Sequence, residues 1–139
     1  MATLLLTWNP DRWPMDYDGF VARTTAGEPI EGRWSVGNRR HGIGPGDRAF
    51  LYRQGSSGRG LVALGDIVSE PYEDDHWSGH GGTSRYVQVR WSEFRRLEDA
   101  LLLEELESVA PQFAWRKVYA SGRTLPEPIA SRLVELWDG

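Results

Sequence analysis

Aromatic and basic side chains occur together in one polar stretch of the sequence, between residues 34 and 41. Trp34 and Ser35 are followed closely by the run Asn38-Arg39-Arg40-His41. A tryptophan ring can stack on a nucleobase, and arginine can form paired hydrogen bonds to a phosphate or a base edge. The Gly-rich loop that follows would let backbone N–H groups approach a phosphate. The pattern is compatible with a site for an unstacked base, and also with an ordinary exposed, charged loop.

Trp77 lies in a polar segment, Glu73 to Ser84, that has almost nothing else to bury. An aromatic side chain in such a loop is a candidate ligand contact. The structural alternative is that Trp77 closes one end of the hydrophobic core. The sequence favours neither interpretation over the other.

A third aromatic cluster follows the first apolar run of the chain and contains Trp8, Trp13 and Tyr17. The proline after Asn9 makes that residue extended and ends the strand. The three rings either cover the bottom of the core or line the mouth of a pocket beside Trp34.

The composition of this chain of 139 residues is that of a single soluble domain, with 40% hydrophobic and 26% charged residues. Its net charge of −4 argues against strong nonspecific binding to nucleic acid. The charge is uneven, because the segment from Gly32 to Gly60 holds a single acid, Asp47. Its basic residues are Arg33, Arg39, Arg40, Arg48, Arg53 and Arg59. This imbalance is compatible with a local anion-binding face.

Several classes of site are not expected. The chain has no cysteine, which excludes disulfides and thiolate metal ligands. Asp74, Asp75, His76 and His80 lack the spacing of a metal site on a regular element, so we expect neither a metal nor another cofactor.

No motif of a nucleophilic, paired-carboxylate or phosphate-binding enzyme is present, so we expect a binding protein. If the chain were an enzyme, the candidate groups would be His41, His76 or Asp66. A protein-interaction module with exposed tryptophans is a further alternative. The start of the chain has no basic leader and no run is long enough to span a membrane, so a cytoplasmic location without membrane contact is expected.

The secondary-structure pattern predicts an α+β fold with a small curved sheet or barrel. Predicted strands are Thr3–Trp8, Ile30–Val36, Arg48–Arg53, Leu61–Val68 and Arg85–Phe94. Predicted helices are Asp16–Arg23, Leu101–Val109 and Pro126–Trp137. Predicted loops are 41–47, 54–60 and 70–84. The positions of Trp91, Trp115 and Trp137 favour the core.

The sequence resembles the EVE domains of the PUA-like superfamily and, more distantly, the YTH domains. The resemblance covers residues 3 to about 94, and we take residues 1–139 as a single EVE-like domain. Its matching segments are Leu4–Trp8, Gly32–Arg39, Gly44–Tyr52, Gly58–Val68 and Arg85–Trp91. The opening Thr7-Trp8-Asn9-Pro10 with Trp13 is most similar to EVE modules attached to HNH nucleases.

This resemblance implies a curved PUA-like β-barrel of about five to six strands flanked by short helices. It also implies a reader of modified cytosine in double-stranded DNA, foremost 5-methylcytosine, that flips the base into an aromatic cage. In the YTH relatives a Trp-Ser pair and a loop Trp form the cage, and Trp34, Ser35 and Trp77 occupy those places here. A reader of modified RNA and a PUA-like nuclease or hydrolase are the alternatives.

The complete candidate site has two parts. The expected base-binding residues are Trp34, Trp77, Ser35, Asn9, Trp13, Tyr17 and Trp8. The expected contacts to the nucleic-acid backbone are Asn38, Arg39, Arg40, His41, Arg53 and Arg59. We expect a monomer with methylated double-stranded DNA as its partner.

Overall fold

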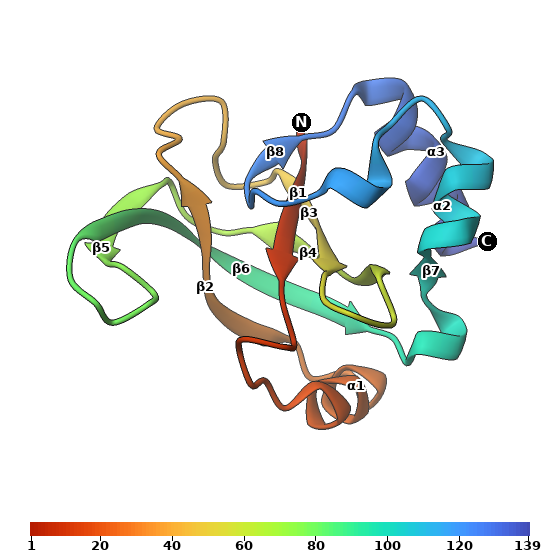
Figure 1. The fold of residues 1–139 in the computed structure, drawn as a ribbon, viewed down its shortest axis with the longest axis horizontal. Helices are drawn as coiled ribbons and strands as arrows, with labels where there is room; N and C mark the ends of the chain where they lie inside the picture. The colour runs from red at the N-terminus through yellow and green to blue at the C-terminus, as the bar shows by residue number, and fades with distance from the viewer.

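A strongly curved mixed β-sheet forms the centre of the structure, a computed structural model that describes residues 1–139 (Figure 1). Its strands are β1 (Thr3–Trp8), β2 (Ile30–Gly37), β3 (Arg48–Arg53), β4 (Gly60–Ile67), β5 (Tyr72–Asp75), β6 (Thr83–Phe94), β7 (Leu101–Leu102) and β8 (Arg123–Thr124). The hydrogen-bonded order is β2-β6-β4-β3-β1-β8, with β5 added on β6 and β7 on β4. The pair β1–β3 is parallel and the other pairs are antiparallel.

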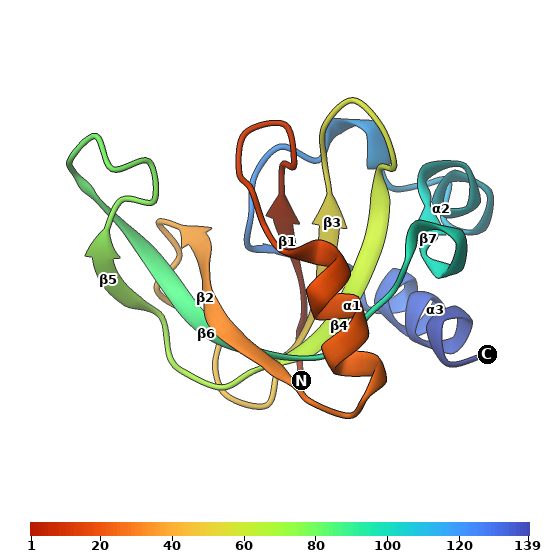
Figure 2. The same ribbon diagram turned by 90° about the horizontal axis from the view of Figure 1, so that it is seen from below.

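The helices lie on two sides of this sheet. They are α1 (Tyr17–Thr25), α2 (Leu103–Val109) and α3 (Glu127–Asp138), with short 3-10 turns at Leu97–Asp99 and Trp115–Lys117. Figure 2 shows the sheet curling into a half-barrel, with α2 and α3 together beside β4. The α+β class and the curved sheet predicted from the sequence are confirmed.

Two hydrophobic clusters explain the apolar runs in β1 and β3. Alternate residues of a strand point to opposite faces. Leu4 and Leu6 therefore enter a cluster inside the curl, to which β1, β2, β3, β4 and β6 all contribute. Leu5 and Phe50 enter a second cluster with α2 and α3 outside the curl. Strands buried on both faces read as continuous hydrophobic segments, as these do.

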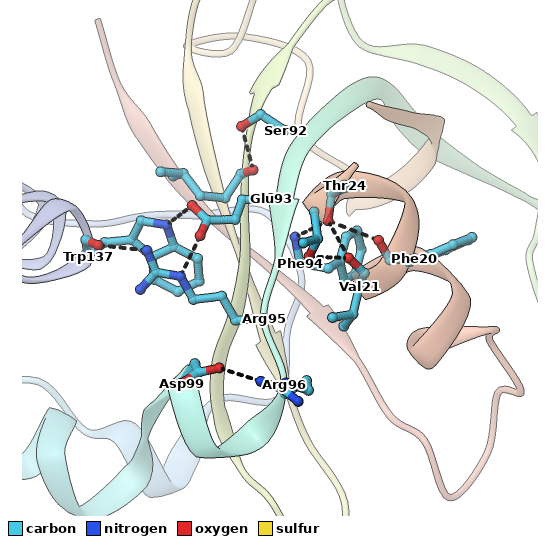
Figure 3. Close-up of polar contacts among 12 residues, drawn as sticks. Phe20, Val21, Thr24, Ser92, Glu93, Phe94, Arg95, Arg96, Asp99 and Trp137 are labelled. Carbon is cyan, nitrogen blue, oxygen red and sulfur yellow. Dashed lines mark hydrogen bonds and ion pairs between the residues drawn. The ribbon is translucent and has the colours of Figure 1, made fainter. Parts of the chain in front are cut away.

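Helix α1 covers the inner cluster and is connected to β6 by hydrogen bonds. Tyr17, Phe20 and Val21 pack on the cluster, as their shared helical face predicts. The hydroxyl of Thr24 donates to the carbonyl of Phe20 at 2.9 Å and accepts from the backbone N–H of Phe94 at 3.0 Å (Figure 3). The helix is thus held to the strand by a buried polar contact.

The predicted strands and helices are confirmed with small shifts at their ends, and one predicted loop is wrong. Residues 70–84 contain strand β5, which pairs with the start of β6 from Tyr72–Tyr86 to Asp75–Thr83. Apolar alternation could not reveal this strand, because Glu73 and the two aspartates after it are exposed. In addition, Leu101 and Leu102 pair with β4, so helix α2 begins two residues later than predicted.

A cluster of polar contacts fastens α3 to the sheet (Figure 3). Trp137 donates from Nε1 to Oε1 of Glu93 at 2.8 Å. Arg95 donates from Nε to Oε2 of Glu93 at 2.6 Å and from an Nη to the carbonyl of Trp137 at 2.7 Å. The guanidinium of Arg95 also lies 3.9 Å from the centre of the Trp137 ring. The buried indole therefore joins the helix to β6.

We expect Trp137→Ala to lower the free energy of unfolding by about 3–5 kcal/mol, because it removes a buried ring, the donor to Oε1 of Glu93 and the aromatic face under Arg95. Urea denaturation measures this difference. The matched control is Arg132→Ala on the exposed side of α3, which breaks a surface ion pair and should cost below about 1 kcal/mol. Equal losses for the two variants would contradict this account of how α3 is held.

Candidate functional site

The curled sheet does not close. Its edge strands are β2 and the short β8, and β8 pairs with only Leu4 and Leu5 of β1, so a gap remains where the end of β1 lies beside β2 without pairing with it. Near this gap the backbone of Thr7 finds side-chain partners in place of a neighbouring strand. Its N–H donates to Oγ of Ser121 at 3.1 Å, and its carbonyl accepts from Nε1 of Trp34 at 3.2 Å. Trp34 thus bridges the two edges of the half-barrel.

The loop before β8 approaches β2 from the other side of the gap. Gly122 has φ = 99°, and a Cβ atom at this position would lie 2.8 Å from Cα of Val36. Only glycine fits this conformation at such a short distance. The loop 119–122 is therefore brought against the end of β2.

A cavity of about 750 Å³ opens at this gap. The ends of β1 and β2, the turn after β1, Trp77 and residues 119–121 line it. Its aromatic residues are Trp8, Trp13, Trp34, Trp77, Tyr86 and Tyr119. None of the 17 lining residues is Asp or Glu, whereas Arg12 and Arg33 are both present. The cavity lining is thus rich in aromatic side chains and free of carboxylates, although the whole chain is acidic.

Trp34 and Trp77 border the same cavity, but their rings have different partners. Trp34 is half-buried and packs edge-on against Trp91, with ring centres 5.3 Å apart. Trp77 contacts Trp13, with ring centres 5.8 Å apart, and lies over the ring of His76 at 4.8 Å. Trp13 and Trp77 are 46% and 41% exposed. The exposed indole pair at the mouth is therefore Trp13–Trp77.

Hydrogen bonds hold the turn that presents Trp13. The carbonyl of Asn9 accepts from the N–H groups of Arg12 and Trp13 at 3.1 and 2.9 Å. Oδ1 of Asn9 accepts from the N–H of Asp11 at 3.0 Å. The carboxylate of Asp11 in turn accepts from the N–H of Ser56 at 2.9 Å, which ties the turn to the β3–β4 loop.

Arg33 fixes the hairpin that carries Trp77. Its guanidinium lies 4.1 Å from the ring centre of Tyr86 and donates to Oδ2 of Asp74 at 3.0 Å. The hydroxyl of Tyr86 donates to the carbonyl of Asp75 at 2.7 Å. These contacts join β2, β5 and β6 next to the cavity, so Arg33 acts as a positioning residue for this wall.

The other expected base-binding residues occupy different environments. Asn9, Ser35 and the buried Trp8 border the cavity. The hydroxyl of Ser35 is engaged with that of Ser84 at 3.2 Å. Tyr17 does not border the cavity: it packs on the inner cluster, and its hydroxyl donates to the carbonyl of Arg95. Burial raises the pKa of Tyr17 to about 12 although nearby Arg53 lowers it.

None of the residues expected to contact the nucleic-acid backbone borders the cavity. Arg39 instead donates to the carbonyl of Gly122 at 2.9 Å and to Oγ1 of Thr124 at 2.6 Å, which supports the loop 119–122. Arg59 donates to the carbonyl of Arg116 at 2.8 Å.

The remaining members of that set lie outside the cavity too. The guanidinium of Arg53 lies 5.3 Å from the ring centre of Trp8, and its buried Nε has no partner. Asn38, Arg40 and His41 are exposed.

The sequence analysis missed several lining residues that matter here: Arg12, Arg33, Gln54, Tyr86 and Tyr119. Arg33 could have been found, because it lies two residues before Ser35 on one strand and so shares its face. Arg12 and Tyr119 belong to loops, and no periodicity indicates where a loop side chain points.

The described chain offers little support for other site classes. No group of three or more His, Asp or Glu side chains in residues 1–139 could hold a metal ion. None of its helices is long and apolar enough to cross a bilayer.

The curled mixed sheet with its helices is a PUA-like α+β fold, and its open edge carries an aromatic cavity. The model of the EVE domain matches residues 23–135, so the chain belongs to the EVE domain family. This confirms the family resemblance drawn from the sequence. No curated protein matches the chain.

Solved structures share the fold at low sequence identity. A hypothetical protein from Leishmania major has a TM-score of 0.68 and 14% identity, covering 99% of this chain and 95% of its own. A Pseudomonas syringae protein has a TM-score of 0.66 and 16% identity, and the match covers 98% of this chain and 99% of that protein. Human THYN1, solved in complex with DNA containing 5-methylcytosine, has a TM-score of 0.65 and 15% identity, with 100% and 99% covered.

We expect Asp11→Ala to loosen the turn that holds Trp13, because a carboxylate hydrogen bond to the β3–β4 loop is lost. Hydrogen exchange of the Arg12 and Trp13 amides should speed up about tenfold. Asp18→Ala, an exposed change on α1, is the control and should leave these two rates unchanged. Unaltered exchange in Asp11→Ala would show that the turn is held without this contact.

Proposed function

We propose that this chain binds DNA that contains a modified cytosine, foremost 5-methylcytosine, and takes the modified base out of the duplex into the cavity between β1 and β2. The observation that carries this proposal is the acid-free, aromatic-rimmed cavity at the open edge of the sheet. Membership of the EVE family and the similarity to human THYN1, solved with methylated DNA, support it.

Stacking on the aromatic lining can offset the free energy that base flipping costs. Extruding a base from a duplex costs a few kcal/mol. Stacking on an aromatic side chain returns about 1–3 kcal/mol per base. The exposed Trp13–Trp77 pair and the half-buried Trp34 are the rings available for this stacking. A methyl group adds on the order of 1 kcal/mol of burial, which predicts several-fold discrimination from hydrophobicity alone.

Asn9 is the best-placed group for reading the edge of the base. Its Oδ1 is engaged by the N–H of Asp11, which leaves Nδ2 without a partner. That amide can donate to an acceptor on the Watson–Crick edge, such as N3 of cytosine. Gln54 uses Nε2 for the carbonyls of Val118 and Tyr119, which leaves its Oε1 as an acceptor.

The proposed activity is binding without bond cleavage, since the cavity-lining residues include neither a carboxylate nor a histidine. A PUA-like nuclease or hydrolase would need a general base beside one of the hydroxyl groups that line this cavity. Incubation of the protein with modified DNA should leave the strands intact on a denaturing gel.

The test is a titration of labelled duplexes that differ at one cytosine, followed by fluorescence anisotropy. We expect tighter binding to the 5-methylcytosine duplex than to the plain one, with 5-hydroxymethylcytosine tolerated. Matched RNA oligonucleotides should compete poorly. Equal affinity for modified and plain duplexes at every salt concentration, or preferred binding of modified RNA, would overturn the proposal.

We expect Trp77→Ala to lower affinity for the methylated duplex by about 5- to 100-fold, because it removes a stacking face. The side chain is 41% exposed, so the fold should persist. Val68→Ala is the matched control: Val68 is 37% exposed and does not border the cavity. A folded Trp77→Ala protein with wild-type affinity and selectivity would remove this ring from the site.

We expect Arg12→Ala to weaken binding to methylated and plain duplexes alike. Arg12 borders the cavity and takes part in none of the ion pairs of the structure, so its charge is available to a phosphate. Loss of one phosphate contact should reduce the slope of log K against log salt by about 1. Selective loss of the methylated duplex would instead place Arg12 on the base.

A further inference from the structure

Tyr119 is an exposed aromatic ring with no role in the fold. It is 76% exposed and forms no ring pair with Trp13 or Trp77, although all three border the cavity. These three are the large aromatic side chains that the chain leaves exposed. Their convergence on a single cavity is not what scattered surface residues would give.

The backbone that carries Tyr119 is held firmly at the rim. Gln54 donates from Nε2 to the carbonyls of Val118 at 2.8 Å and of Tyr119 at 3.4 Å. The N–H of Gly122 donates to the carbonyl of Leu5 at 2.9 Å, and Ser121 is tied to Thr7 as described. Exposure of the ring is therefore a consequence of where the loop is fixed.

Such a ring is suited to stacking. Stacking restricts only the two side-chain torsion angles of a tyrosine. A tyrosine ring on a fixed backbone can therefore stack at a low cost in conformational entropy. Every nucleobase offers a π-face, so the contact tolerates any sequence. Because no carboxylate lines the cavity, a phosphate next to the ring meets no repulsion from this wall.

When one base is held in the cavity, the adjacent bases of the same strand lie at the mouth of the cavity. Trp13 and Trp77 contact each other, whereas Tyr119 stands apart from both rings. We propose that Tyr119 is a second stacking position, which receives the base adjacent to the captured one on the same strand. The site then engages at least two consecutive nucleotides. This inference rests on the proposed function and adds a subsite to it.

The experiment compares wild type, Tyr119→Ala and Tyr119→Phe with three probes by calorimetry. The probes are 5-methyl-dCMP, a trinucleotide with 5-methylcytosine between two thymines, and the same trinucleotide with abasic flanks. We expect Tyr119→Ala to bind the thymine-flanked trinucleotide about 5- to 100-fold more weakly, and Tyr119→Phe to bind like wild type. The loss of affinity in Tyr119→Ala should be much smaller for 5-methyl-dCMP, which has no neighbouring base, than for the thymine-flanked trinucleotide.

Removing the flanking bases should reproduce the effect of the mutation. Wild type should lose a similar factor with abasic flanks, and Tyr119→Ala should lose little more, since both changes delete the same contact. Circular dichroism and thermal melting check that the variants fold, and Val68→Ala is the surface control.

Several outcomes would overturn the second subsite while leaving the proposed function intact. Wild-type affinity of Tyr119→Ala for the thymine-flanked trinucleotide would do so. A loss that is equal with abasic and thymine flanks, or equal with 5-methyl-dCMP and the thymine-flanked trinucleotide, would exclude same-strand stacking. Failure of the wild-type protein to bind any probe or duplex that contains 5-methylcytosine would instead refute the proposed function itself.

Discussion

The candidate site depends on the gap between the end of β1 and strand β2, where the sheet does not close. A curled sheet that stops short of closure leaves backbone groups without strand partners, and these groups need other hydrogen bonds. Here Trp34 and Ser121 satisfy Thr7. Trp34 and Ser121 also line the cavity, so the same side chains satisfy the open backbone of β1 and form part of the candidate site.

Rigid connections, more than regular elements, place the aromatic rim. The turn carrying Trp13 is tied to the β3–β4 loop through Asp11, and the hairpin carrying Trp77 is tied to β2 through Arg33. The loop carrying Tyr119 is tied to β3 through Gln54. Side chains exposed to solvent but fixed at their backbones lose little freedom when a ligand binds, which preorganises the rim.

Electrostatics in this chain are local. A net charge of −4 disfavours nonspecific attachment to a polyanion, whereas the cavity lining contains no acid and includes Arg12 as well as the ion-paired Arg33. For the DNA binding proposed above, the acidic net charge keeps the part of the affinity that ignores sequence small. The remaining arginines have structural uses: Arg39 supports the loop 119–122, and Arg95 holds α3.

Local pattern determined most of the fold. The apolar runs of β1 and β3, the alternation in β6 and the apolar faces of α1 and α3 all read directly from the sequence, because burial imposes these periods. The exposed strand β5 could not be read, since an edge strand of acidic residues carries no apolar signal.

Six of the residues expected near a ligand border the cavity: Trp8, Asn9, Trp13, Trp34, Ser35 and Trp77. Only the tertiary structure decided that Tyr17 packs inside, that Arg39 bonds to backbone, and that Arg12, Arg33 and Tyr119 join the rim. The reason is that loop direction and sheet curvature depend on contacts between residues far apart in the chain, which a local pattern does not contain.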